Sequence, residues 1–175
     1  IVNIRKENLL IAGYDGVIRE GLATSIMKSI GSRQDGKRVL IYQAHEDEQN
    51  IFGNFMVLPF VTTRDSSWDG CDLESYAHAE SVETFIIIDS LDFGRMFLPT
   101  PLGSLRKAGQ QPTPGETLRL LIDSSASTHV HVILFVESYK RFSNSARDLL
   151  NQFDLRIGFG LDEDDAGNFI SSGGY

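Results

Sequence analysis

The segment from Leu9 to Gly21 constrains the fold of this chain more than any other part of its sequence. It begins with an apolar run, Leu9–Ala12, that has the length of a buried strand. The run enters a turn marked by Gly13 and Gly16, and apolar residues follow at helical spacing, at positions 22, 26, 27 and 30. The segment therefore predicts a strand, a glycine loop and a helix, the unit from which parallel sheets are built.

The glycine loop has the layout of a phosphate-binding loop without its chemical groups. A P-loop has the pattern G-x-x-x-x-G-K-[ST], in which main-chain N–H groups and a helix N-terminus face a phosphate. Counted from Gly13, the pattern requires Gly, Lys and Ser or Thr where the chain has Ile18, Arg19 and Glu20. Ile18 disfavours a positive φ, Arg19 has a bulkier head group than Lys, and Glu20 replaces the hydroxyl that would hold Mg²⁺. An ordinary turn that never bound nucleotide explains these residues equally well.

Five further segments have the composition of strands and alternate with segments of helical periodicity. They are Arg38–Ala44, Phe55–Val61, Thr84–Asp89, Val130–Val136 and Leu155–Leu161. Pro59 indicates that the second of them is an edge strand or the end of a strand. The segments at 85–88 and 130–136 are apolar with almost no alternation, which is typical of parallel strands covered on both faces. The order predicts an α/β fold with a mainly parallel, doubly wound sheet and with Phe85–Ile88 near its centre.

Helices are expected between these strands. The expected helical segments are 22–30, 72–82, Glu116–Ser125 and Phe142–Phe153, the last of them capped by Ser143 or Asn144. Residues 99–114 carry four of the five prolines and are expected to form an exposed loop. An acidic and glycine-rich tail is expected after Leu161.

The charge and composition of the chain exclude several functional classes. Its 175 residues suffice for one domain, and the start at Ile1, close to the first strand, leads us to expect a piece of a longer protein. The net charge of −8 is incompatible with the basic surface of an independent nucleic-acid-binding domain. No apolar run approaches the ~18 residues of a membrane span, so no direct membrane insertion is expected. The single cysteine, Cys71, fits a reducing compartment, and we expect a cytoplasmic protein.

The order of the segments resembles the RecA-like P-loop ATPase domain of FtsK/SpoIIIE-type translocases. The four segments that carry this resemblance are Leu9–Gly16, Phe85–Asp89, His131–Glu137 and Phe153–Asp165. They stand where the family has its P-loop strand, its Walker B strand, its sensor strand and a final Arg-containing strand. The resemblance implies a three-layer fold with a mainly parallel central sheet. It also implies that residues 1–175 are a single degenerate ATPase-like domain, of the kind found in tandem within larger multidomain chains.

The resemblance also assigns roles to individual residues. Asp89 stands at the Walker B position, and Ser90 stands where an active member has the Glu that polarises water. Glu137 stands at the sensor position. With the degenerate loop residues Gly13, Gly16, Arg19 and Glu20, these changes imply a pseudo-ATPase domain with a structural or regulatory role. No metal site and no tightly bound cofactor are expected, and any binding of Mg·ATP is expected to be weak. The implied partners are neighbouring domains of the parent chain or further copies of it, with DNA reached only through the full assembly.

Other interpretations of these residues remain open. An Asp that ends a buried strand more often caps a turn or pairs with a neighbouring Arg than binds a metal, and Asp89 fits that description. A second functional hypothesis is a nucleotide-binding domain with slow or regulated hydrolysis, in DNA translocation or protein secretion, in which Arg19 faces the phosphates. A third is a small α/β enzyme with its chemistry at Asp15, Asp89 and Glu137. Within the first hypothesis, Glu20 could accept from the N–H groups at the helix start and so fill the pocket.

The remaining polar clusters are expected to be structural. The acidic runs Glu46–Glu48 and Asp162–Asp165 are typical of solvated loops. His129 and His131 lack further zinc ligands, so a hydrogen-bonded structural role is expected. Arg156 interrupts the last strand, and we expect it to serve structure or a subunit interface.

Overall fold

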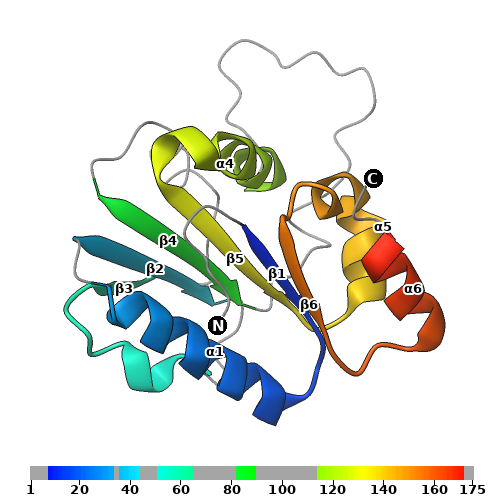
Figure 1. Cartoon of the computed structure of the whole chain (residues 1–175), viewed down its shortest axis with the longest axis horizontal. Coiled ribbons are helices and arrows are strands. Elements are labelled where there is room, and N and C mark those ends of the chain that lie inside the picture. Colours follow the sequence, from blue (N-terminus) through cyan, green and yellow to red (C-terminus); the bar gives the residue numbers. More distant parts are fainter. Residues whose placement is uncertain (1–7, 34–35, 44–50, 65–81, 90–113, 172–175) are drawn as a thin grey trace.

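The computed structural model describes residues 8–33, 36–43, 51–64, 82–89 and 114–171 of the chain (Figure 1). They form a six-stranded sheet in the order β3-β2-β4-β5-β1-β6, and every neighbouring pair of strands is parallel. The strands are β1 (Leu9–Ala12), β2 (Lys37–Gln43), β3 (Val61–Arg64), β4 (Glu83–Asp89), β5 (Val130–Val136) and β6 (Leu155–Gly158). The expected parallel α/β sheet is confirmed, and β4 lies inside it, between β2 and β5.

Helices cover both faces of this sheet and give the expected three layers (Figure 1). Helix α1 (Gly16–Gly31) packs on one face, and α4 (Pro114–Thr128), α5 (Tyr139–Leu150) and α6 (Glu163–Ser171) pack on the other. Successive side chains of a strand point to opposite faces, so each inner strand supplies both cores. In β1, Leu9 and Ile11 join the core under α1, whereas Leu10 and Ala12 join the core under the other three helices. This is why the strands are apolar without alternation.

The apolar run Phe55–Val61 does not form the strand that its composition suggested. A 3-10 helix, Gly53–Phe55, is followed by turns, and β3 begins only at Val61, at the edge of the sheet. Val61 N–H donates to the Leu58 carbonyl at 3.0 Å, so the main chain turns within the run. Four of its side chains pack against the core under α1: Phe55, Leu58, Phe60 and Val61.

Helix α5 begins earlier than its apolar spacing indicated. It starts at Tyr139, and Phe142 N–H donates to the Ser138 carbonyl at 3.1 Å in its first turn. Ser143 and Asn144 therefore lie inside the helix and do not cap it, and Phe153 is buried beyond its end. Ser138 directly precedes the helix, and the apolar spacing of the segment does not mark this start.

The acidic segment after β6 forms a helix where a tail was expected. Asp162 caps α6 by accepting from Asp165 N–H at 2.7 Å, and three acidic residues occupy the first turn. Negative charge is favourable there because it faces the positive end of the helix dipole. Arg156 fixes this helix, since its guanidinium donates to the carbonyls of Phe153 at 3.4 Å and Phe169 at 3.2 Å. Arg156 thus has the structural role that was one of its two expected roles.

Two expected segments lie outside the described residues: the helix at 72–82, except for its last residue, and the loop from 99 to 113. Pro114, expected at the end of that loop, is the first residue of α4. Proline is favoured at the first turn of a helix because the missing N–H group would have no partner there.

Gly21 lies inside α1, and a Cβ at this position would meet nothing within 4 Å. The substitution Gly21→Ala is therefore expected to raise the free energy of unfolding by about 0.5–1 kcal/mol, because glycine is the costlier residue inside a helix. Gly13→Ala is the matched contrast and should destabilise, since its φ is +153° and a Cβ there would overlap Phe159. Chemical denaturation measures both values, and equal effects of the two substitutions would contradict this account.

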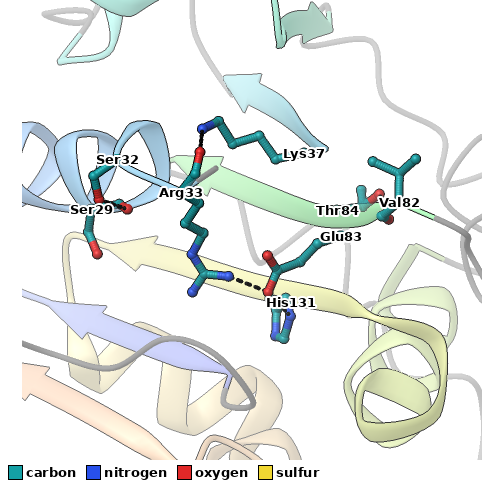
Figure 2. Close-up of polar contacts among 8 residues, drawn as sticks. All are labelled: Ser29, Ser32, Arg33, Lys37, Val82, Glu83, Thr84 and His131. Carbon is teal, nitrogen blue, oxygen red and sulfur yellow. Dashed lines mark hydrogen bonds and ion pairs between the residues drawn. The ribbon is translucent and has the colours of Figure 1, made fainter. Parts of the chain in front are cut away.

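At the amino edge of the sheet, a cluster of polar side chains joins α1 to β4 and β5 (Figure 2). Glu83 is the first residue of β4, and its carboxylate accepts from the guanidinium of Arg33, just beyond the end of α1. The Nε2 atom of His131 lies 3.5 Å from the same Glu83 oxygen. Both groups also contact Phe85: the His131 ring stacks on it with centroids 5.1 Å apart, and the Arg33 guanidinium lies 4.9 Å from its centroid. His131 therefore holds the structural position that was expected for it.

Burial lowers the pKa of His131 below its ordinary value of 6.5, and the Glu83 carboxylate opposes this change. The positive charge of Arg33 and the neighbouring His129 lower the pKa further. Below about pH 6.5 the unfolded chain takes up a proton at this histidine that the folded chain binds only at lower pH. The free energy of unfolding is therefore expected to decrease as the pH falls from 7.5 to 5.5.

The substitution His131→Phe should make this decrease smaller, because it keeps a stacked ring and removes the titrating group. Urea unfolding at pH 7.5, 6.5 and 5.5 measures the slope for the wild type and the variant. His129→Asn is the control, since His129 is exposed and has a φ of 57°, which Asn tolerates. If His131→Phe leaves the slope unchanged, the buried histidine is not its source.

Candidate functional site

Three neighbouring strands bring the expected site residues together at the carboxyl edge of the sheet. β1 ends just before Gly13, β4 ends at Asp89, and β5 ends just before Glu137. The strand order β4-β5-β1 makes these ends adjacent, and Gly13 N–H donates to the Val136 carbonyl at 2.9 Å. In open α/β sheets this edge is where ligands bind. The predicted site residues therefore lie together at one edge of the sheet, and the chemistry available there depends on their side chains.

The loop after β1 packs against the segment that follows the neighbouring strand, β6. Phe159 follows β6, and its N–H donates to the Ala12 carbonyl at 3.0 Å. Its side chain and carbonyl oxygen lie so close to Gly13 that a Cβ there would overlap both. Gly13 is thus required by a close main-chain approach to Phe159, which accounts for this glycine without a phosphate.

The N-terminus of α1 is capped by the chain itself. Asp15 is the N-cap residue, and its Oδ1 atom accepts from Ile18 N–H at 3.0 Å. The helix begins at Gly16, and Arg19 N–H donates to the Asp15 carbonyl at 2.9 Å. The hypothesis that Glu20 accepts from these N–H groups is wrong, because Asp15 does so and Glu20 is exposed. An Asp directly before a helical pattern is a known capping signal, so the sequence contained the information.

Arg19 points into the protein and forms an ion pair with Asp89. Its NH2 atom donates to Asp89 Oδ1, and its NH1 atom donates to the Gly13 carbonyl at 3.4 Å. The Arg19 residue is only 6% exposed, and its guanidinium lies 6.0 Å from the centroid of the Phe135 ring. The interpretation that Asp89 pairs with a neighbouring Arg is therefore confirmed. The alternative, in which Arg19 faces bound phosphates, does not describe this arrangement.

Glu137 lies beside this ion pair and faces solvent. Its Oε1 atom is 3.8 Å from Arg19 NH1, and its side chain is 51% exposed. Asp15 and Glu20 are also exposed. Four carboxylates against one guanidinium leave three negative charges in the region defined by Asp15, Arg19, Glu20, Asp89 and Glu137. This balance repels a triphosphate.

The site residues lack the Gly, Lys and Ser or Thr with which a P-loop holds Mg·ATP. The Arg19 guanidinium is engaged by Asp89, and the Ile18 N–H group at the start of α1 donates to the Asp15 carboxylate. Among the residues that the structure describes, no three His, Cys, Asp or Glu side chains are grouped so that they could hold a metal ion. Ser90, the expected substitute for the catalytic Glu, lies outside the described residues.

Comparison with known proteins places the chain by its fold. No protein-family model matches the sequence, and no curated protein matches it. Among solved structures, the cytoplasmic domain of EssC superposes with a TM-score of 0.66 at 12% identity, over 96% of this chain and 36% of that chain. EccC of Thermomonospora curvata (ATPases 2 and 3), in complex with a signal sequence peptide, gives a TM-score of 0.60 at 10% identity, over 93% of this chain and 31% of that chain.

The cytoplasmic domain of the Thermomonospora curvata type VII secretion ATPase EccC gives a TM-score of 0.55 at 10% identity, over 93% of this chain and 20% of that chain. The chain thus spans about a third or less of the length of these structures. At such identities the likeness shows the fold, and the expected RecA-like α/β architecture is confirmed. No described helix is both long and apolar enough to cross a membrane.

Proposed function

We propose that this chain is a pseudo-ATPase domain of a larger motor assembly and that it serves packing or regulation instead of nucleotide turnover. The observation that carries this proposal is the buried ion pair between Arg19 and Asp89 at the carboxyl edge of the sheet. In an active domain this edge would hold phosphate and Mg²⁺. Here the protein satisfies the carboxylate with its own guanidinium.

The likeness to EssC and EccC supports the proposal that the parent protein acts in protein secretion, with the other domains of that protein as the partners of this one. One of those structures contains a signal sequence peptide, which favours protein over DNA as the cargo of the assembly. The net charge of −8 is consistent with that choice, because DNA binding requires a basic surface. The first of those structures is itself a cytoplasmic domain, and we assign this chain to the cytoplasm as part of the proposal.

Nucleotide binding would have to break the ion pair. Removing one partner of a buried pair costs about 3–5 kcal/mol, which is a loss of roughly a hundredfold to a few thousandfold in affinity. Glu137 adds repulsion, which for charges ~4 Å apart at an effective dielectric constant of ~20 is about 4 kcal/mol. We therefore expect a dissociation constant for Mg·ATP above about 1 mM and no measurable hydrolysis.

Isothermal titration calorimetry with Mg·ATP tests this expectation. The triple substitution Ile18→Gly, Arg19→Lys and Glu20→Ser should bring measurable binding without hydrolysis, because Glu137 remains and Ser90 supplies no carboxylate. Asp123→Ser, at an exposed position of α4, is the control for the removal of one negative charge. Micromolar binding of Mg·ATP by the unmodified chain would overturn the proposal in favour of a slowly hydrolysing nucleotide-binding domain.

A further inference from the structure

Three apolar side chains are exposed together where the loop after β1 enters α1. Tyr14 is 74% exposed, Val17 is 81% exposed, and Ile18 is also exposed. We call these three residues the α1 tip. Tyr14 lies against the loop after β6, since a Cβ at Gly160 would be 3.6 Å from its ring. Two other large apolar residues are exposed in the described part of the chain, Val57 and Leu120, and they belong to other segments.

The fold does not require apolar residues at the α1 tip. The face of α1 that packs on the sheet consists of Arg19, Ala23, Ile26, Met27 and Ile30. The first helical turn contains no acidic residue, although such residues would stabilise the helix dipole. Polar side chains at positions 17 and 18 would therefore leave the helix at least as stable. Clustered exposed apolar residues of this kind often mark an interaction site.

Several carboxylates lie around the α1 tip. Asp15 and Glu20 are exposed on the same loop and helix turn, and Glu137 lies beside Gly13 at the end of the adjacent strand. From residue 13 to residue 25 the single basic residue is Arg19, which is buried against Asp89. The segment 158–165, which Tyr14 contacts through Gly160, contains four acidic residues and no basic one. The surface is apolar at its centre and acidic at its rim.

We propose that the α1 tip binds a basic segment of a partner protein that also presents apolar side chains. In this complex the apolar side chains of the partner pack on Val17 and Ile18, and a Lys or Arg of the partner pairs with Glu137. Gly21 lies one helical turn after Val17 and has open space around it, so the main chain of the partner can approach α1 closely. A second copy of this chain would bring the same acidic rim and a net charge of −8, and nucleic acid would bring phosphates. Both would be repelled.

The inference goes beyond the proposed function, because it concerns a surface outside the Arg19–Asp89 ion pair, and peptide binding is measured without nucleotide. The probe is an 18-residue helical peptide with Leu on one face and Lys on the other. Two control peptides carry Ser in place of Leu, or Glu in place of Lys. Calorimetry with the unmodified chain gives the affinities at 50 mM and 300 mM NaCl, and sedimentation gives the oligomeric state of the chain alone.

We expect the Leu/Lys peptide to bind at least tenfold more tightly than either control peptide, and more weakly at the higher salt concentration. Val17→Lys should weaken binding at least tenfold, and Glu137→Gln should weaken it severalfold. Val57→Lys, at a position that is 86% exposed elsewhere on the chain, should change the affinity less than twofold. Absent binding, equal binding of the Ser/Lys peptide, or an equal effect of Val57→Lys would each overturn the proposal. Dimerisation that Val17→Lys abolishes would also overturn it and would assign the surface to a second copy.

Discussion

The substitution Arg19→Met is expected to lower the free energy of unfolding by about 3–5 kcal/mol, because it removes the guanidinium that pairs with the buried carboxylate of Asp89. Met has nearly the length of the Arg stem and keeps apolar contact with the core, so the loss is mainly electrostatic. The Asp89 residue is 7% exposed, and water cannot replace the guanidinium without rearrangement. Such a loss is a large fraction of the 5–15 kcal/mol that stabilises a typical domain.

A double variant separates the electrostatic part of this loss from the loss of packing contacts. The double variant Arg19→Met with Asp89→Leu should recover most of the loss, because replacing both charges of a buried pair by apolar groups is often neutral. Lys140→Met, at an exposed position of α5, is the control and should change stability by less than about 0.5 kcal/mol. Urea denaturation followed by circular dichroism gives all three values. If Arg19→Met lowers the free energy of unfolding by less than about 1 kcal/mol, the ion pair is not buried away from water and this account is wrong.

The substitution Asn8→Ala is expected to cost about 3–4 kcal/mol, because several buried polar groups lose their hydrogen bonds at once. Asn8 is a buried residue directly before β1. Its Oδ1 atom accepts from Val132 N–H at 2.9 Å, and its Nδ2 atom donates to Ser125 Oγ at 3.0 Å and to the Ile122 carbonyl at 3.4 Å. One side chain thus connects the start of β1 with β5 and α4.

Two serines on α4 provide a graded control for this result. Ser125→Ala removes one partner of Asn8 and should cost about 1 kcal/mol. Ser127→Ala removes an exposed hydroxyl that donates to the Ser124 carbonyl within the helix, and it should cost less than about 0.5 kcal/mol. The expected order of destabilisation is Asn8→Ala, then Ser125→Ala, then Ser127→Ala. If Asn8→Ala costs no more than Ser125→Ala, Asn8 does not join the three elements.

The strands were predictable from sequence where burial on both faces left an unmistakable pattern. β4 and β5 are apolar throughout their middle, and their central places in the sheet follow from that composition. The run at 55–61 has a similar composition, but its side chains pack on the core from a turn, and hydrophobicity alone does not distinguish the two cases. Helix α6 was not predicted, because acidic residues in the first turn of a helix have the same composition as a solvated acidic loop.

The sequence predicted where the candidate site residues lie, but it did not predict which side chains pair with one another there. The ends of neighbouring parallel strands meet at one edge, so Gly13, Asp89 and Glu137 were correctly brought together. The partner of Asp89 is 70 residues away in sequence, and its identity depends on which face of α1 packs on the sheet. Asn8 gave no signal at all, because a single polar residue before a strand has the same pattern whether it is solvated or buried.

The two Arg–carboxylate pairs lie at opposite ends of the same strand. Arg19 pairs with the last residue of β4, and Arg33 pairs with the first, Glu83. From Arg19 to its end at Gly31, α1 rises about 18 Å, and Arg33 follows two residues later. The step from Glu83 to Asp89 spans about 20 Å of strand. One pair therefore connects the first turns of α1 to β4 at the carboxyl edge of the sheet, and the other connects the residues just after α1 to β4 at the amino edge. The contact between this helix and this strand is thus made by charged groups near its two ends and by apolar side chains of the core between them.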